Sequence, residues 1–223
     1  MIIAIDGHAG SGKTTVSKIL AEKLTMLHVN TGAMYRAATF FCVHNNISPN
    51  SDIRLSNSIL NMDIEMKFDG SIYLNGSNIT NLINSTNVTN QVSYYSAIPE
   101  LREAMVILQR KVVSDCDAVV EGRDIATTVF PNAELKFFFT ANIATRAKRR
   151  HKDFLVSGVD ISIEKLIEDI KERDYIDSNR ESSPLKISKE SIIVDTTNIS
   201  IDNQVNKLIE IVNNKRKNLH GEF

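Results

Sequence analysis

Near its start the chain reads Ile2-Ile3-Ala4-Ile5-Asp6-Gly7-His8-Ala9-Gly10-Ser11-Gly12-Lys13-Thr14. Residues 2–6 form an apolar, β-branched run that predicts a buried strand, and residues 13–24 carry a helical pattern. Between them, Gly7 to Thr14 fits G-x-x-x-x-G-K-[ST] in full. In such a loop the glycines let backbone N–H groups converge on phosphate oxygens, and the helix N-terminus adds positive potential. The stretch therefore predicts a phosphate-binding loop in an α/β domain.

The rest of the chain continues this alternation of strand and helix. Further apolar runs predict strands at 27–30, 118–121, 135–140 and 192–195, and helical patterns lie at 13–24, 33–45, 99–114, 144–156, 162–176 and 201–215. Together they predict a doubly wound α/β domain with a parallel five-stranded sheet whose strands are buried on both faces. Residues 48–97 break the rhythm. They are rich in Asn, Ser and Thr and contain a hairpin signal around Asp69-Gly70, which predicts a small substrate-side insertion.

Composition excludes several classes of protein. The chain has 223 residues, 42% of them hydrophobic, and a formal net charge of −1. This is enough apolar residue for a core, and there is no basic excess for binding a nucleic-acid polymer or an anionic membrane. We expect a cytoplasmic monomer, since no apolar run is long enough to span a membrane and the N-terminus lacks the basic lead-in of a signal peptide. Cys42 and Cys116 are expected to be buried thiols.

A phosphate-binding loop indicates a nucleotide but not a function. A switch GTPase would need N-K-x-D and D-x-x-G, and neither string occurs. The other large class transfers a phosphoryl group to a second substrate, which requires a second anion site that faces the first. Two strand ends offer one, because Asn30-Thr31-Gly32-Ala33-Met34-Tyr35-Arg36 and Val120-Glu121-Gly122-Arg123-Asp124 each lead out of a predicted strand. Ligands of open α/β sheets bind beyond the carboxyl ends of strands, so Lys13, Arg36, Arg123 and Asp124 are expected to converge, unless Arg123 and Asp124 only form a surface salt bridge.

Two later helical segments concentrate basic residues. The first carries Arg146, Lys148, Arg149 and Arg150, and in the second Arg173, Asp177 and Arg180 are spaced to share one helical face. An ion-pair ladder along a solvated helix explains such spacing as well. Because transfer between two anions requires negative charge to be neutralised at several oxygens, we favour a mobile lid over phosphates.

With these motifs in place, the chain resembles the bacterial cytidylate kinases, a branch of the nucleoside monophosphate kinases, from Ile2 to about the last helix. The strings that carry the resemblance are G-H-A-G-S-G-K-T-T, T-G-A-M-Y-R, S-A-I-P-E-L-R, E-G-R-D, F-P-N-A-E-L-K, R-A-K-R-R and K-E-R-D-Y-I-D-S-N-R. The resemblance implies one P-loop kinase domain, 1–223. Its core would be about 1–47, 98–145 and 181–223, its inserted NMP-binding subdomain about 48–97 and its helical lid about 146–180.

The resemblance also implies an activity and its residues: phosphoryl transfer from ATP, with Mg²⁺, to CMP and dCMP. The implied ATP contacts are Gly7, His8, Ala9, Gly10, Ser11, Gly12, Lys13, Thr14, Thr15, Arg146, Arg149 and Arg150, with Mg²⁺ near Thr14. The implied CMP contacts are Thr31, Gly32, Tyr35, Arg36, Ser93, Arg102, Arg123, Asp124, Arg173, Asp177 and Arg180. Lys13, Arg123, Arg173 and Arg180 would be the catalytic set.

Within this set, Ser93, Arg102 and Asp124 would read the base, and Asp177 would hold the ribose. Cytosine suits such a site because its N4 amino group donates to a carboxylate, whereas uracil presents a carbonyl there. The sequence departs from the family pattern at His8, Asn30 and Ala126, where Pro, Asp and Gly are usual, and none of these removes an expected catalytic group. Two alternatives stay open: a kinase for another monophosphate or small metabolite, and a regulatory P-loop NTPase.

Overall fold

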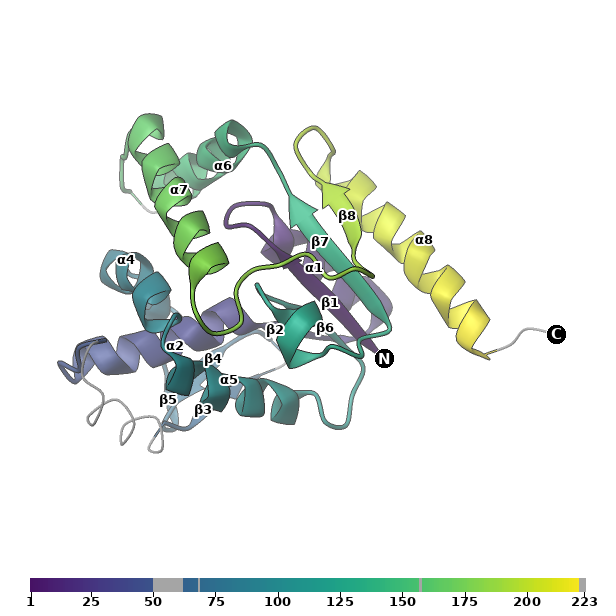
Figure 1. Ribbon diagram of the computed structural model, residues 1–223, viewed down its shortest axis with the longest axis horizontal. Helices are drawn as coiled ribbons and strands as arrows, with labels where there is room; N and C mark the ends of the chain where they lie inside the picture. Colours follow the sequence, from purple (N-terminus) through teal and green to yellow (C-terminus); the bar gives the residue numbers. More distant parts are fainter. Residues whose placement is uncertain (50–61, 68, 157, 221–223) are drawn as a thin grey trace.

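A parallel five-stranded sheet forms the centre of the molecule (Figure 1). The computed structural model describes residues 1–49, 62–67, 69–156 and 158–220. The strands are β1 (Ile2–Gly7), β2 (Leu27–Asn30), β6 (Ala118–Glu121), β7 (Leu135–Thr140) and β8 (Ile192–Asp195). They lie in the order β2-β6-β1-β7-β8, and every neighbouring pair is parallel. The predicted doubly wound sheet is therefore confirmed.

Helices cover both faces of this sheet. They are α1 (Lys13–Leu24), α2 (Thr31–His44), α5 (Pro99–Val112) and α8 (Ile201–His220). Side chains of β1 alternate between two hydrophobic clusters, as the period of a strand requires. Ile3 and Ile5 join the cluster that includes residues of α1 and α8, while Ala4 joins the cluster with residues of α2 and α5. Burial on both faces explains why the strand is apolar at nearly every position.

The predicted hairpin lies in a small antiparallel sheet beside α2. Its strands are β3 (Ile64–Met66), β4 (Ile72–Leu74) and β5 (Ser77–Asn78). Gly70 has a φ of 84°, in the left-handed region that a glycine adopts without strain, and the Asp69 carboxylate accepts the N–H of Ser71. The turn at Asp69-Gly70 is confirmed, whereas Phe68 lies outside the described residues.

The Asn-rich stretch also contains helical structure that the sequence did not predict. It forms a 3₁₀ turn, η1 (Leu82–Asn84), and the helix α4 (Thr86–Tyr95). The Ser85 hydroxyl accepts the N–H of Val88 and so caps the start of α4. Val88, Val92 and Tyr95 are buried. Tertiary burial of this narrow apolar face overrides the weak helix propensity of its Asn, Thr and Ser residues.

Two further helices form a layer at the carboxyl end of the sheet (Figure 1). They are α6 (Ile143–Val156) and α7 (Ile163–Asn179). Ala147, Leu166 and Ile170 form a hydrophobic cluster between them that is separate from the two clusters of the sheet. The two helices therefore pack on each other through a core of their own.

Three sequence expectations are wrong in detail. Strand β8 is not buried on both faces, because it lies at the sheet edge, and Ile193 is 58% exposed. Cys116 is only half-buried, since it lies in the turn that precedes β6. Arg180 does not share a helical face with Arg173, because α7 ends at Asn179 and Arg180 has extended backbone angles.

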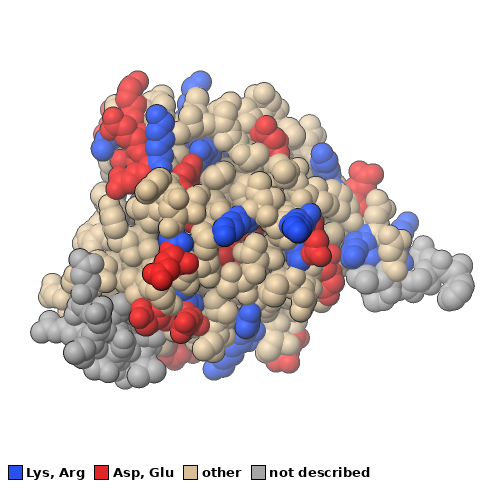
Figure 2. Space-filling model, in the orientation of Figure 1, with Lys and Arg blue, Asp and Glu red and all other residues tan. Residues whose placement is uncertain are grey.

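The surface carries no dominant charge on the face that Figure 2 shows, where basic and acidic side chains are interspersed. This agrees with the net charge of −1. Within the described residues, none of the helices combines the length and the apolar character needed to cross a membrane.

Candidate active site

A cavity of about 860 Å³ opens where β1, β2 and β6 end. The register explains why these strand ends meet, since Glu121 at the end of β6 lies opposite both Ile5 of β1 and Asn30 of β2. The cavity is lined by the phosphate-binding loop, by Arg36 and Arg123, by parts of the small sheet and η1, and by Arg149 and Arg150 of α6. Lys13, Arg36 and Arg123 therefore converge on this cavity as predicted, whereas Asp124 is buried and is not among the residues that line it.

The phosphate-binding loop has the backbone that its glycines were expected to provide. Gly7, Gly10 and Gly12 all have φ values in the left-handed range, between 73° and 145°. A Cβ at Gly7 would lie 2.0 Å from the carbonyl oxygen of Phe139 on β7, so no larger residue fits. Gly12 begins α1 without a side-chain cap, which leaves the first N–H groups of the helix directed at the cavity.

Lys13 lies inside this loop, with its side chain 6% exposed. Its ammonium group donates to the carbonyl oxygens of Gly7 and His8, at 2.8 Å each. Burial, and then the charge of Arg123, lower the pKa of Lys13 well below its usual value, while Glu121 opposes the shift. A lysine that is desolvated in this way gains most from a bound anion.

Thr14 donates its hydroxyl proton to the carboxylate of Glu121 at 3.0 Å. The second oxygen of this carboxylate lies 3.3 Å from Nε2 of His28, which is itself 3.0 Å from the hydroxyl of Ser17. Thr31 extends the network, because its hydroxyl donates to the backbone carbonyl of Glu121 at 2.7 Å. The end of β6 therefore orients residues of both predicted anion sites.

A buried ion-pair cluster is centred on Asp124, the residue after Arg123. Asp124 accepts from Arg102 at 2.5 Å and from Arg180 at 3.3 Å, one guanidinium on each carboxylate oxygen. Arg102 also donates to the carbonyl of Ser96 at 2.9 Å and lies 5.2 Å from the ring centroid of Tyr35. A carboxylate between two guanidiniums presents an acceptor beside donors, which is the complement of a base edge with both kinds of group.

Arginines crowd the space between this cluster and the phosphate-binding loop. Arg123 pairs with Asp177 at 2.8 Å and not with its neighbour Asp124. Burial, and then the charge of Arg123, lower the pKa of Arg173 to about 9. Burial and the charges of Arg150 and Arg123 also lower the pKa of Arg36. The positive charges of these arginines repel one another. A bound anion would relieve that repulsion, so the region favours anion binding.

Arg36 is held by the insertion. Its Nη1 donates to the amide oxygen of Asn84 in η1 at 2.7 Å, and the amide nitrogen of Asn84 donates to the carbonyl of Thr80 at 3.4 Å. Asn84 also lines the large cavity. The Asn-rich insertion thus positions one of the predicted phosphate contacts.

The three predicted lid arginines lie in different environments. Arg146 is buried and donates to the carbonyl of Ala9 at 3.3 Å and to Asp174 of α7 at 2.7 Å. Arg149 donates to the carbonyl and hydroxyl oxygens of Thr196, at 2.7 and 3.0 Å. Arg150 lies 5.4 Å from the ring centroid of Phe154. Arg146 and Arg149 therefore connect α6 to the phosphate-binding loop and to the segment after β8, and Arg149 and Arg150 line the large cavity.

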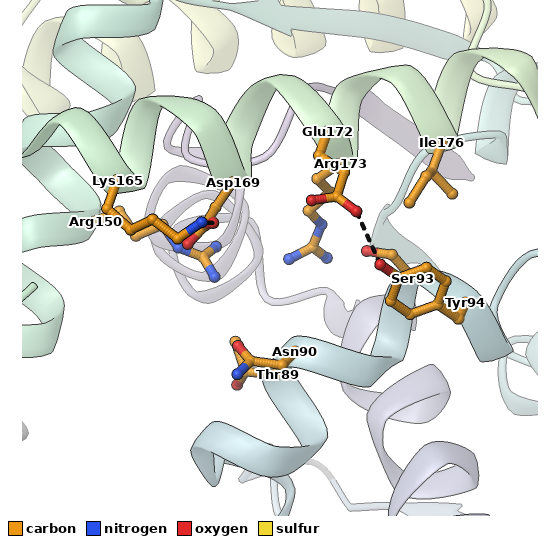
Figure 3. A pocket seen from close by; sticks show the side chains of 10 residues that line it. All are labelled: Thr89, Asn90, Ser93, Tyr94, Arg150, Lys165, Asp169, Glu172, Arg173 and Ile176. Carbon is orange, nitrogen blue, oxygen red and sulfur yellow. Dashed lines mark hydrogen bonds and ion pairs between the residues drawn. The ribbon is translucent and has the colours of Figure 1, made fainter.

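A second cavity, of about 320 Å³, lies between α4 and α7 (Figure 3). Ser93 of α4 and Arg173 of α7 line it from opposite sides. Across its mouth the hydroxyl of Tyr94 donates to the carboxylate of Glu172 at 2.8 Å. This hydrogen bond joins α4 to α7.

Five side chains whose hydrogen bonds connect the parts of the candidate site were not predicted from the sequence. They are Asp6, Tyr94, Glu121, Asn84 and Glu172. Asp6 and Glu121 each carry an acidic side chain at the last position of an apolar run, directly before a glycine, and this pattern is a signal that could have found them. Nothing local marks Tyr94, Asn84 or Glu172, because their partners lie far away in the sequence.

The comparisons with known proteins agree with this geometry. The cytidylate kinase family matches residues 3–214. A cytidylate kinase of Clostridium botulinum (strain Loch Maree / Type A3) is 43% identical over 94% of this chain and 96% of its own. A cytidylate kinase of Lactobacillus johnsonii is also 43% identical, over 98% of this chain and 96% of its own. With its phosphate-binding loop, its arginine cluster and this match over nearly its whole length, the chain belongs to the cytidylate kinase family.

Proposed function

We propose that the protein transfers the γ-phosphoryl group of ATP to CMP and dCMP, yielding ADP and CDP or dCDP. The observation that carries the proposal is that the phosphate-binding loop and Arg123 line one cavity, and that Asp124, the residue after Arg123, is a buried carboxylate flanked by the guanidiniums of Arg102 and Arg180. The relatives named cytidylate kinase support the same reaction.

The base preference follows from the donors and acceptors of this cluster. The N4 amino group of cytosine donates, and the Asp124 carboxylate accepts; the O2 and N3 atoms of cytosine accept, and Arg102 donates. Uracil would place its O4 carbonyl against the carboxylate. Each well-formed contact of this kind discriminates by about 1–3 kcal/mol. Ser93, in the wall of the neighbouring cavity, completes the proposed base site.

Transfer itself requires positioning and charge neutralisation and no side-chain nucleophile. Lys13 would leave its bonds to the Gly7 and His8 carbonyls for the phosphates of ATP. Arg36, Arg123, Arg173 and Arg180 would hold the acceptor phosphate and the group in transfer, and Asp177 would meet the ribose. These contacts would hold the acceptor oxygen and the leaving oxygen in line.

The residues at Thr14 fit a magnesium ion. Hydroxyl and carboxylate oxygens are the ligands that Mg²⁺ prefers, and the Thr14 hydroxyl lies 3.0 Å from the nearly buried Glu121 carboxylate. Thr14 would hold the ion, and Glu121 would orient the hydroxyl. When bound, Mg²⁺ neutralises charge on the β- and γ-phosphate oxygens. No group of three or more His, Cys, Asp or Glu residues suited to a metal occurs in the described part of the chain.

We propose that two segments outside the central sheet close over the bound substrates. The segment 48–97 would act as the NMP-binding subdomain and 146–180 as the lid, around a core of 1–47, 98–145 and 181–223. A closed lid excludes water, which would otherwise accept the phosphoryl group. A monomeric state and a cytoplasmic location stay predictions of the sequence.

The test is ADP release from ATP and Mg²⁺ in the presence of CMP, dCMP, UMP, AMP, GMP or shikimate. We expect strong stimulation by CMP and dCMP alone. Stimulation by a different acceptor would retain the kinase and reject the base site. Slow hydrolysis that no acceptor accelerates would favour a regulatory NTPase.

A further inference from the structure

We propose that Asp6 is a positioning residue for the acceptor, because its carboxylate holds the segment that carries Arg123 and Asp124 in register with the phosphate-binding loop. The inference rests on the proposed function, in which Asp124 reads the base. Asp6 is the penultimate residue of the strand β1, directly before Gly7 of the loop, and it is 1% exposed. It therefore acts through other residues and does not meet a substrate.

The backbone ladder between β1 and β6 ends just before this point. Its last bond runs from the N–H of Gly122 to the carbonyl of Ile5, at 3.0 Å. The chain then leaves the sheet through Arg123 and Asp124 and enters the π-helical turn η2 (Ile125–Val129). Backbone donors beyond Gly122 have no strand to bond, and buried donors without a partner are costly.

Asp6 supplies these missing acceptors. One of its carboxylate oxygens accepts the N–H of Ile125 and the other accepts the N–H of Ala126, at 2.8 Å each. On the other side, the carbonyl of Asp124 accepts the N–H groups of Thr128 and Val129, at 2.8 and 3.1 Å. Hydrogen bonds on both sides of Asp124 thus fix its backbone. The position of the Cα atom from which its side chain reaches Arg102 and Arg180 is fixed as a result.

An ionised carboxylate is the group that two convergent N–H donors require. It offers two acceptor oxygens, whereas a protonated carboxyl or an amide offers one acceptor and places a donor against the second N–H. Burial is the main cause that raises the pKa of Asp6, to about 6. The two backbone donors and Lys13 oppose the rise, and the charge of Asp124 adds to it. Protonation of Asp6 should therefore loosen the Asp124 segment just below neutral pH.

The first test compares Asp6→Asn with wild type. We expect the KM for CMP to rise about tenfold at neutral pH, since one buried N–H loses its acceptor. The KM for ATP, whose loop precedes the affected segment, should change much less. Glu134→Gln is the matched control, because Glu134 accepts the N–H of Ile2 at the opposite end of β1, at 2.7 Å. Glu134→Gln should leave the KM for CMP unchanged.

The pH profile separates positioning from a merely structural role. As pH falls through about 6, wild-type Asp6 is protonated, so the ratio of the variant's KM for CMP to that of wild type should shrink. The acceptor phosphate also titrates near pH 6, but it does so for both proteins and cancels in the ratio. Equal KM values, or a ratio that does not change with pH, would overturn the proposal.

Two further measurements keep the outcome clear. The first uses the wild-type protein and serves even if Asp6→Asn does not fold. The amide proton shifts of Ile125 and Ala126 should titrate together with a midpoint near pH 6, and shifts that do not change with pH would reject the proposal. Asp124→Asn tests the proposed function separately. If Asp124→Asn alters selectivity between CMP and UMP while Asp6→Asn does not change the KM for CMP, only the positioning role fails. If Asp124→Asn has no effect on selectivity, the base assignment fails, and the role of Asp6 fails with it.

Discussion

Arg102 and Asp124 form an ion pair of 2.5 Å between side chains that are only 1% and 4% exposed. Removing two such charges from water is costly, and the cost is recovered only when further hydrogen bonds satisfy both groups. Here the carbonyl of Ser96 and the guanidinium of Arg180 supply two such bonds, while Nε of Arg102 is buried without a hydrogen-bond partner among the described residues. The pair therefore fixes the Asp124 carboxylate between two guanidiniums on the segment that follows β6.

Replacing Asp124 with asparagine should weaken CMP more than ATP. The amide retains one acceptor but places a donor where the N4 amino group of cytosine would bind, so we expect the KM for CMP to rise at least tenfold and the preference over UMP to fall. Asp124→Ala is the less informative variant, since two buried guanidiniums left unpaired would cost about 3–5 kcal/mol of stability. Steady-state kinetics with both acceptors is the measurement, and an equal loss for CMP and ATP would contradict the base-reading role.

Replacing Lys13 with alanine should abolish turnover and preserve the fold. Loss of a charge that stabilises the transferred group costs about a hundredfold or more in kcat. The free energy of unfolding should fall little, because burial already disfavours the charged form of Lys13. Kinetics together with thermal unfolding measures both effects. Near-normal turnover in a folded variant would disprove the donor assignment.

Replacing Tyr94 with phenylalanine removes the hydrogen bond to Glu172 that joins α4 to α7. Because Tyr94 is 49% exposed, we expect a change within about 0.5 kcal/mol in the free energy of unfolding. The KM for CMP should nevertheless rise about twofold to threefold, since the mouth of the cavity loses a closing contact. Tyr175→Phe is the matched control, because Tyr175 is an exposed tyrosine of α7. The same kinetic effect in both variants would show that the contact across the cavity is not the cause.

The raised pKa of Asp6 predicts a specific pH dependence of stability. Its value is about 6 in the folded protein and 3.8 in the reference state, so the folded state binds the proton more tightly. The corresponding stabilisation is fully present below about pH 4 and is lost as pH rises through 6, a change of about 3 kcal/mol. The Asp6→Asn variant has no carboxyl group to titrate at this position, so its free energy of unfolding does not show this loss. The difference in free energy of unfolding, variant minus wild type, should therefore increase by about that amount between pH 4 and 7 in urea titrations. A difference that stays constant with pH would show that Asp6 has an ordinary pKa.

Much of the fold could be predicted because its signals are local. The apolar runs at 2–6, 27–30, 118–121 and 135–140 became strands of the central sheet, and the turn at Asp69-Gly70 formed as its residues indicate. Burial on both faces requires continuous apolar runs, and a phosphate-binding loop requires glycines at fixed spacing. The helix α4 was not predictable, since its apolar face is narrow and its burial against α2 is a tertiary property.

The candidate site likewise has features that the sequence predicts and features that only tertiary contacts decide. The sequence by itself determined the phosphate-binding loop and the strand ends that bring Arg36 and Arg123 to one cavity, because a parallel sheet brings its carboxyl ends together whatever the details of packing. Only the tertiary structure decided how these charges are paired. Arg123 binds Asp177, 54 residues away, and Asp124 binds Arg102 and Arg180 instead of its own neighbour. The physical reason is that the position of α7 over the sheet edge, and of Asp6 beneath η2, depends on contacts between residues distant in the chain, which no local pattern records.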